Sequence, residues 1–335
     1  MNRNTPLRLA YQFILAATTG VLFAGVASSA RASNDTTVAT FSAVGYDPAT
    51  GELGVAVQSR FFAVGSVVPC AQAGVGAIAS QAYANTTFGP RGLKLLREAL
   101  SVQETLDLLL ATDPQREQRQ VGIVDAKGNS ATFTGRKCQT WAGGRNGSNF
   151  AVQGNILVSE ETVAAMEKAF SETKGMLGEK LMRALEEGQK AGGDARGMQS
   201  AAILIVKDGA GYGGYNDRYC DLRVDDHPEP IKELRRIFDL WKVQALIQEG
   251  YRRLEDRQYD RAIEAGRQAL ALDARSGESQ YHLACYYSRA GNKVDALKML
   301  RDAIGLDAKL APRAAADSDF ETLREDPEFK KLTGK

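Results

Sequence analysis

The residues best suited to chemistry lie directly after an apolar N-terminal segment. Thr40–Tyr46 and Leu53–Ser59 alternate in the manner of β-strands. Between them, Asp47–Gly51 supplies the proline and glycine of a tight turn. This spacing predicts a hairpin in which the polar triplet Gln58–Arg60 ends beside Thr40. Two hydroxyls, an amide and a guanidinium would then share one end of a sheet.

A threonine at the start of a chain can supply both the nucleophile and the base for amide hydrolysis. A free α-amine has a pKa of roughly 7.7–8.0, so part of it is neutral at pH 7 and can accept the hydroxyl proton during attack on a carbonyl. A cation such as Arg60 would favour the neutral amine further. Because the chain has only two histidines, His227 and His282, a mechanism that needs none suits it. Thr40 is therefore the candidate nucleophile for cleavage of an amide or peptide-like bond.

Processing decides whether this amine is free. Met1–Ala32 has the pattern of a secretory signal, with positive residues at its start, an uncharged apolar segment and small residues near its end. Cleavage directly after it would leave Ser33 first. Cleavage after Ala39, or later removal of residues 33–39 as a propeptide, would expose Thr40. The apolar segment is also long enough to be weighed as an uncleaved membrane anchor. We expect export to the periplasm or the exterior, with only transient membrane contact through the signal.

Further motifs follow the hairpin. They are Thr40-Phe-Ser, the segment Gly54–Gly65, Ala73–Ala77, Phe88–Leu93, Gln153–Leu157 and Asp221–Pro228. With these motifs, residues 40–242 resemble the DUF1028 family of uncharacterised proteins, which is placed in the N-terminal-nucleophile (Ntn) hydrolase superfamily. The resemblance implies an αββα sandwich and supplies no substrate.

The triplet at the end of the second strand resembles the Asp-Ser-Arg of proteasome-type β subunits. In this sequence Gln58 stands in place of the aspartate, and no lysine occurs between Arg60 and Lys94. The lysine that tunes the proteasome nucleophile therefore has no counterpart. Arg60 is left as the electrostatic tuner of Thr40, with Ser59 orienting the amine. The alternative interpretation is that Arg60 and Ser59 are ordinary polar residues at the end of a strand.

A tetrahedral intermediate needs hydrogen-bond donors for its oxyanion. Asn155 is the first candidate, and the backbone amides around Ser80-Gln81 are the second; a turn role is the alternative for Asn155. Asn85 and Arg91 flank a loop at the expected mouth of the site, where Arg91 would suit a substrate carboxylate or simply be an exposed first-turn residue. The predicted catalytic residues are Thr40, Ser59, Arg60 and Asn155, and the predicted substrate-binding residues are Gln58, Gln81, Asn85 and Arg91.

The remaining pattern predicts an α+β fold. Further strands are expected at residues 67–68, 74–80, 121–133 (a hairpin), 150–158, 201–206 and 219–224. Helices are expected at residues 90–100, 102–111, 160–171 and 177–189. Because the helices fall in consecutive pairs between groups of strands, two sheets sandwiched between helix layers are favoured over a doubly wound parallel sheet.

The C-terminal part contains an internal repeat of 34 residues. Gly250, Ala262 and Ala269 recur as Ala284, Ala296 and Ala303, which is the spacing of tetratricopeptide repeats. We therefore expect five parts: a signal peptide and short propeptide at 1–39, an Ntn-like sandwich at 40–228, a connecting helix at 229–242, two TPR-like repeats at 243–310 and a helical cap at 311–335.

Composition argues against several other functions. The 42 basic and 41 acidic residues give no reason to expect a nucleic-acid partner. The four cysteines lack metal-ligand spacing, and Asp225–Pro230 is a helix start in its simplest interpretation, so we expect no metal and no cofactor. Catalysis by Cys70 or Cys138 is a weak third hypothesis, because no histidine is close to either in sequence.

Two functional hypotheses remain. The first is an exported amidohydrolase acting on a small-molecule amide or peptide through Thr40. The second is a catalytically inactive Ntn-fold scaffold whose TPR-like repeats bind a protein partner, favoured modestly by Gln58 and the missing lysine. The oligomeric state, including a homo-oligomer, and any disulfide pairing stay open.

Overall fold

The computed structural model describes residues 40–334. The expected signal peptide and propeptide, residues 1–39, fall outside the described residues. The strands are β1 (Thr40–Asp47), β2 (Glu52–Ser59), β3 (Pro69–Gln72), β4 (Gly76–Ala82), β5 (Arg119–Asp125), β6 (Ser130–Thr134), β7 (Gly143–Gly147), β8 (Phe150–Asn155), β9 (Ser200–Val206) and β10 (Arg218–Val224). The α-helices are α1 (Phe88–Arg97), α2 (Val102–Ala111), α3 (Glu161–Glu172), α4 (Leu177–Lys190), α5 (Pro230–Glu255), α6 (Tyr259–Leu272), α7 (Gly277–Arg289), α8 (Lys293–Leu306), α9 (Leu310–Ala316) and α10 (Pro327–Thr333).

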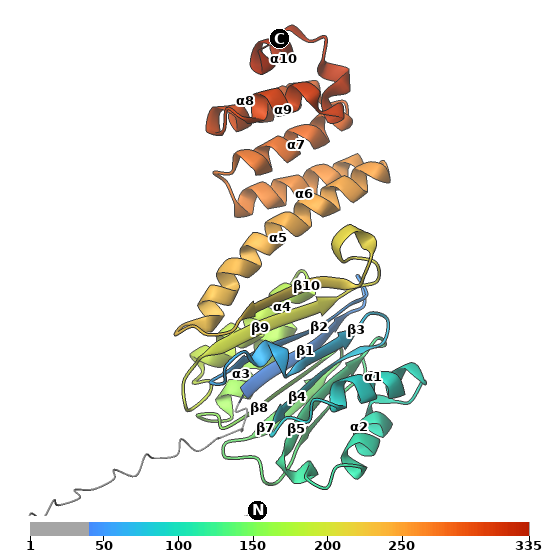
Figure 1. The fold of residues 1–335 in the computed structure, drawn as a ribbon, viewed down its shortest axis with the longest axis vertical. Helices are drawn as coiled ribbons and strands as arrows, with labels where there is room; N and C mark the ends of the chain where they lie inside the picture. The colour runs from blue at the N-terminus through green and yellow to red at the C-terminus, as the bar shows by residue number, and fades with distance from the viewer. Residues whose placement is uncertain (1–39, 335) are drawn as a thin grey trace, which may run out of the picture. The chain divides into compact units, whose positions relative to one another are not determined.

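The strands form two antiparallel sheets (Figure 1). The larger sheet has six strands in the order β10-β9-β2-β1-β8-β7, and the smaller has four in the order β3-β4-β5-β6. β1 therefore lies in the interior of the larger sheet, between β2 and β8. Because an interior strand is hydrogen-bonded on both sides, the position of Thr40 at its start is fixed by two neighbours.

Period-two alternation gives the larger sheet two different apolar faces. Phe41, Ala56 and Ile203 point to a core shared with α3 and α4. Val44, Val55 and Ala202 point the other way and pack against the smaller sheet.

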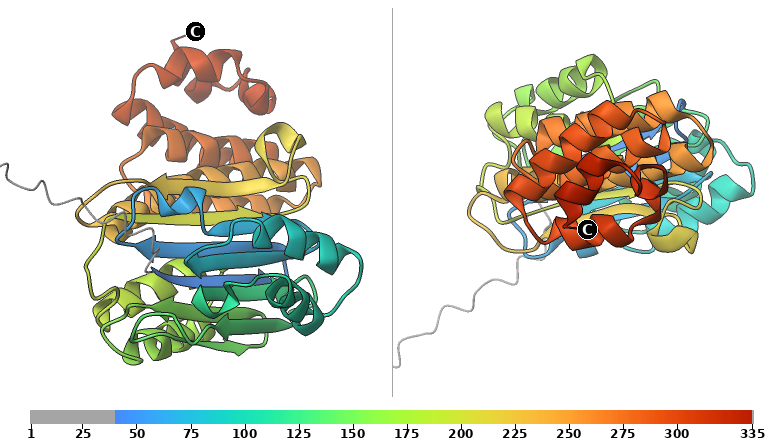
Figure 2. Two further views of the ribbon diagram at one scale, coloured as in Figure 1. Left: turned by 60° about the horizontal axis from the view of Figure 1, so that its bottom comes forward. Right: turned by 90° about the horizontal axis from the view of Figure 1, so that it is seen from above.

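The smaller sheet buries its second face against α1 and α2, through residues such as Ile78 and Ile123. The pair α1/α2 and the pair α3/α4 thus cover opposite sides of the stacked sheets (Figure 2). The predicted α+β class is confirmed, including the two sheets and the consecutive helix pairs beside them.

Helix α5 links the sheets to the C-terminal helices. Its first half is held by Arg235, which donates to Glu186 at 2.7 Å and Glu179 at 3.0 Å, and by Trp241, whose Nε1 donates to the Tyr219 carbonyl at 3.2 Å. Its second half packs against α6, and α7 packs against α8. The expected boundary between residues 242 and 243 falls inside α5, because Trp241–Ala245 contains no residue that ends a helix.

The helix pairs approach closely where side chains are small. Gly250 and Gly266 both face the Tyr286 ring, whose hydroxyl donates to the Ile247 carbonyl at 2.6 Å. A β-carbon on Gly250 would overlap that ring, whereas one on Gly305 of α8 would meet no atom within 4 Å.

The same substitution at these two glycines should therefore have opposite effects. Gly305→Ala is expected to raise the free energy of unfolding by up to about 1 kcal/mol through helix propensity. Gly250→Ala should lower it, because overpacking against a hydrogen-bonded ring costs about 1–3 kcal/mol and exceeds the propensity gain. Urea unfolding of both variants measures this. Equal stabilisation by Gly250→Ala and Gly305→Ala would show that the Tyr286 ring moves aside without a cost in free energy.

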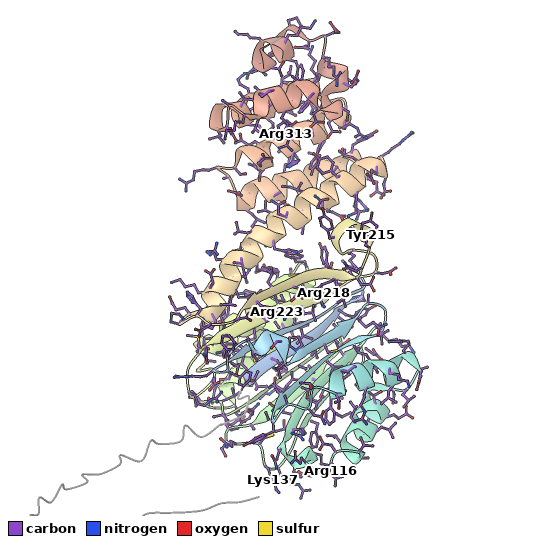
Figure 3. The ribbon with its side chains drawn as sticks, viewed as in Figure 1. Arg116, Lys137, Tyr215, Arg218, Arg223 and Arg313 are labelled. Atoms are coloured by element: carbon purple, nitrogen blue, oxygen red, sulfur yellow. The ribbon has the colours of Figure 1, made fainter. Side chains whose placement is uncertain are left out.

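The β10 edge of the larger sheet carries charged residues. Asp221 pairs with Arg218 at 2.7 Å and with Arg223 at 3.0 Å, and both arginines lie along β10 (Figure 3). Charged side chains on an edge strand oppose pairing with another sheet.

One local expectation was wrong, and one strand was missed. Residues 67–68 are not a strand, because the chain turns through a 3-10 helix at Val64–Ser66 and β3 begins at Pro69. β7, with the sequence Gly-Gly-Arg-Asn-Gly, was not expected at all; it lacks the β-branched residues that mark a strand and is held by pairing with β8. Among the described helices, none has the length and apolar character needed to cross a membrane.

Candidate functional site

Thr40 begins β1 with its side chain between the two sheets. Ser59 of β2 and Asn155 of β8 are its direct cross-strand partners, so all three side chains share the face that packs on the smaller sheet. Thr40 Oγ1 donates to Ser59 Oγ at 3.2 Å. All three residues are fully buried. The structure thus brings together three of the four predicted catalytic residues.

The space between the sheets is polar at this end. Gln81 Nε2 from β4 donates to the Thr40 carbonyl at 3.1 Å, and Asn155 Nδ2 approaches the same oxygen at 3.5 Å. Gln120 Oε1 from β5 accepts from Gln81 Nε2 at 2.8 Å and from Asn155 Nδ2 at 3.0 Å. Ser42 donates to Gln81 Oε1 at 2.6 Å. We call Ser42, Gln81, Gln120, Gln153 and Asn155 the amide layer.

Gln153 completes the layer from β8. Its Nε2 donates to Ser42 Oγ at 2.6 Å and to the Ser42 carbonyl at 3.2 Å. Its side chain lies across Gly122 of β5, where a β-carbon would overlap the amide. Glycine is needed there by this close approach.

The second predicted group of oxyanion donors is engaged in the fold. The Ser80 backbone N–H donates to the Val68 carbonyl at 3.3 Å. Gln81 instead reaches Thr40 with its side-chain amide.

Gln58 does not join this group. It pairs with Phe41 and Ala201, so its side chain points to the face that carries α3 and α4, away from Thr40 Oγ1. It is fully buried, and neither amide atom has a hydrogen-bond partner among residues 40–334.

A loop after α4 lies at the start of β1. Asp194 Oδ2 accepts from the Arg60 backbone N–H at 3.1 Å, and the Ala195 N–H donates to the Ile156 carbonyl at 2.9 Å. Arg60 and Ile156 directly follow the two strand partners of Thr40. The Asp194 carboxylate is buried and ion-paired with Arg196 at 3.0 Å. The charged side chains of Asp194 and Arg196 therefore lie near the Thr40 end of β1.

The predicted tuner, Arg60, contacts this loop. Its guanidinium is exposed and donates to the Arg196 carbonyl at 2.6 Å. The charge of Arg60 is therefore directed to the loop surface, whereas the hydroxyl contact of Thr40 is to Ser59.

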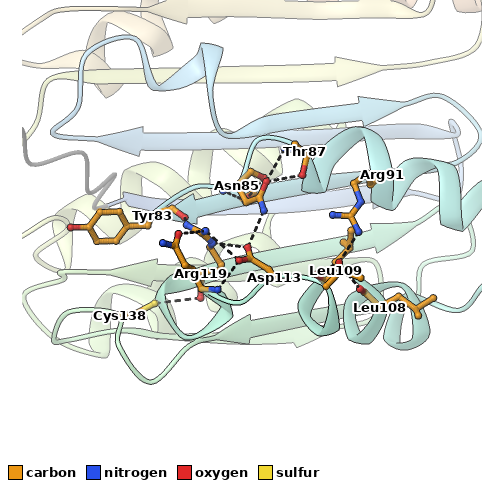
Figure 4. Close-up of polar contacts among 12 residues, drawn as sticks. Tyr83, Asn85, Thr87, Arg91, Leu108, Leu109, Asp113, Arg119 and Cys138 are labelled. Carbon is orange, nitrogen blue, oxygen red and sulfur yellow. Dashed lines mark hydrogen bonds and ion pairs between the residues drawn. The ribbon is translucent and has the colours of Figure 1, made fainter.

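Asn85 and Arg91 belong to a separate cluster beside α1 and α2 (Figure 4). Asn85 Nδ2 donates to Asp113 Oδ2 at 2.9 Å, as does Arg119 Nε at 2.8 Å. Arg91 donates to the Thr112 hydroxyl at 2.7 Å. The pKa of Asp113 falls to about 2, because the hydrogen bonds from Arg119, Asn85 and the Gln115 N–H outweigh the effect of burial. These contacts anchor the ends of α1 and α2.

The cysteine hypothesis loses support. Burial raises the pKa of the Cys70 thiol, and it raises that of Cys138 to about 11. Both are thiols at neutral pH, whereas the thiolate is the nucleophile. All four cysteines are free, so the structure contains no disulfide among residues 40–334.

One group of side chains has the spacing of metal ligands in the described part of the chain: Cys285, Asp317 and Asp319. The fold already uses both carboxylates. Asp317 accepts from the Tyr281 hydroxyl at 2.6 Å, and Asp319 pairs with Arg289 at 3.0 Å.

Sequence reasoning missed Ser42, Gln120, Gln153 and Asp194. The first three could have been noticed as buried polar residues on the inward face of strands whose other inward residues are mostly apolar or small. Asp194 lies in the glycine-rich turn Gly192–Gly197, which offered no strand or helix pattern to place it.

Comparison with known proteins agrees with this fold. The crystal structure of protein SPO2555 from Silicibacter pomeroyi, a DUF1028 protein, is similar, with a TM-score of 0.55 and 30% sequence identity. The match covers 60% of this chain and 84% of that one. No curated protein matches the chain. The model of DUF1028, a family of unknown function, matches residues 40–234, and the chain therefore belongs to the DUF1028 family.

Proposed function

We propose that the protein is an exported amide hydrolase of the Ntn type, with Thr40 Oγ1 as its nucleophile. The observation that carries the proposal is the placement of Thr40 in an interior strand between β2 and β8, with its hydroxyl 3.2 Å from Ser59 Oγ between the sheets. Two antiparallel sheets with helix pairs on their outer faces are also the architecture expected of that superfamily.

The chemistry requires removal of residues 1–39. Thr40 is fully buried while it is joined to them, and an amide nitrogen has no basic lone pair. Cleavage after Ala39 gives the α-amine, which takes the Oγ1 proton as the oxygen attacks the substrate carbonyl. Collapse of the tetrahedral intermediate breaks the C–N bond, and the proton passes to the leaving amine. Water then hydrolyses the ester on Thr40, which restores the hydroxyl.

The C-terminal helices would serve this activity by recruiting a partner or restricting access. Their 34-residue period and their consecutive helix pairs support the TPR-like interpretation. A groove of about 480 Å³ lies between the start of α4 and helices α5 and α6, lined by Met176, Leu246 and Leu272 among others.

An inactive binding protein is the second candidate function. It is favoured by three uncharged side chains at Thr40, since Ser59, Gln81 and Asn155 contact this residue and carry no charge. In that case the amide layer would serve only the packing of the two sheets.

The mature N-terminus distinguishes the two candidates at low cost. We expect intact-mass analysis of exported protein to find a chain that begins at Thr40. A chain that begins at Ser33 in all of the exported material would keep the Thr40 nitrogen as an amide and would exclude the hydrolase.

A further inference from the structure

The orientation of the amide layer is fixed by backbone carbonyls. Gln120 Nε2 donates to the Gly154 carbonyl at 2.7 Å and to the Gly143 carbonyl at 3.2 Å. A carbonyl oxygen can only accept, so Gln120 must present its nitrogen to these two groups. Its Oε1 must then face Asn155 and Gln81 as an acceptor.

The orientation of Gln120 also fixes the orientation of the Asn155 amide. Because Gln120 Oε1 accepts, Asn155 has to direct Nδ2 toward it, at 3.0 Å. Asn155 Oδ1 then points elsewhere, and it is fully buried without a hydrogen-bond partner among residues 40–334. A buried polar group without a hydrogen-bond partner is destabilising. The unprocessed chain therefore contains an acceptor for which the described residues provide no donor.

Thr40 lies directly opposite Asn155, the residue that carries this acceptor. The two residues are cross-strand partners, and Asn155 Nδ2 already approaches the Thr40 carbonyl at 3.5 Å. A peptide nitrogen at Thr40 has one N–H, which is directed by the planar peptide bond. A freed α-ammonium has three N–H donors and rotates about N–Cα, so it can direct one of them to Asn155 Oδ1.

We propose that Asn155 is a positioning residue whose Oδ1 accepts a hydrogen bond from the α-amino group of mature Thr40, and that Gln120 holds Asn155 in this orientation. The inference rests on the proposed function for the free amine. It replaces the oxyanion role predicted for Asn155, since Nδ2 donates to Gln120 Oε1 and its second hydrogen faces the Thr40 carbonyl. An N–H held by Oδ1 leaves the lone pair of the neutral amine free to face Oγ1.

Charged groups also surround this end of β1. Arg60, Asp194 and Arg196 lie on the loops after β2 and α4. From the smaller sheet, Arg119 is adjacent to Gln120 and pairs with Asp113 at 2.8 Å. A comparison between variants of Asn155 leaves these charges unchanged.

The test measures the pKa of the Thr40 α-amine in the mature protein. The rate of carbamylation by cyanate is followed against pH, and the modified N-terminal peptide is quantified by mass spectrometry. A hydrogen bond to an ammonium raises its pKa. Asn155→Ala should therefore lower the amine pKa by about half a unit or more, and Asn155→Asp should raise it, because a carboxylate attracts the ammonium more strongly. Ser42→Ala, in the same layer, should leave it unchanged.

Gln120→Met provides a second route if the Asn155 variants do not fold. A thioether is only a weak acceptor and offers Asn155 Nδ2 no amide oxygen, so Asn155 loses its fixed orientation and the amine pKa should fall as in Asn155→Ala. Unchanged amine pKa values in all of these folded variants would overturn the inference. So would an Asn155→Ala variant that reacts more slowly with an electrophile at Thr40 while its amine pKa stays the same, since that result indicates an oxyanion donor. The predicted pKa shifts without any reactivity of the Thr40 hydroxyl would instead contradict the hydrolase and leave the positioning role standing.

Discussion

Replacing Thr40 by alanine is expected to abolish covalent labelling of the mature protein by an electrophile that traps threonine nucleophiles, such as a β-lactone. The substitution removes the hydroxyl of the residue that carries the α-amine, and the methyl group of alanine fits the buried site. In other hydrolases, removal of the nucleophile lowers kcat by about 10⁴-fold or more. Intact mass after incubation with the electrophile measures the labelled fraction.

Two matched variants control this result. Thr40→Ser keeps a hydroxyl and an α-amine and should retain labelling. Ser42→Ala removes a buried hydroxyl two residues along the same strand face, which is engaged with Gln81 and Gln153, and should be labelled like the unaltered protein. Labelling that persists in Thr40→Ala and disappears in Ser42→Ala would assign the nucleophile to Ser42.

Replacing Arg119 by methionine is expected to lower the free energy of unfolding by about 3 kcal/mol, because it leaves the buried Asp113 carboxylate without its counter-ion. The pair is close, at 2.8 Å, and both side chains are nearly inaccessible to solvent. Arg119 also donates to the Tyr83 carbonyl at 2.5 Å and to Gln115 Oε1 at 2.8 Å. Urea unfolding at pH 7 measures the loss.

The Asp113–Arg119 pair also predicts that the free energy of unfolding depends on pH. Asp113 has a pKa of about 2 in the folded chain, against its ordinary value of 3.8. Its contribution is therefore fully present above pH 4 and is lost as the pH falls toward 2, with a total of about 2 kcal/mol. Asp113→Asn should be less stable at pH 7, and the difference from the unaltered protein should shrink below pH 4.

An exposed pair supplies the control. Glu98→Gln breaks the ion pair between Glu98 and Lys94, whose side chains are both mostly exposed. It should change the free energy of unfolding by less than about 0.5 kcal/mol. A loss of similar size from Glu98→Gln and Arg119→Met would mean that burial adds nothing to the Asp113 pair.

Much of the fold followed from local patterns. The alternation of β1 and β2, the exact span of α2 and the start of α4 were predicted from period and turn residues. β7 could not be, because its residues have no strand preference and its pairing partner decides its conformation.

The site was predictable only in part. Alternation alone implied that Ser59, as the partner of Thr40, shares its face and that Gln58 does not, so the outward orientation of Gln58 from this site could have been anticipated. Gln81, Gln120 and Asp194 reach Thr40 or its strand neighbours from positions at least 35 residues away in the sequence. Such contacts depend on how the two sheets stack, which no local pattern specifies.

The position of covalent attachment tests the central claim most directly. Mature protein is treated with the electrophile, digested and sequenced by tandem mass spectrometry. The proposed mechanism requires a single modified peptide that begins at Thr40 and carries the adduct on that residue. An adduct on any other side chain, or a first residue other than Thr40 in the exported protein, would contradict it.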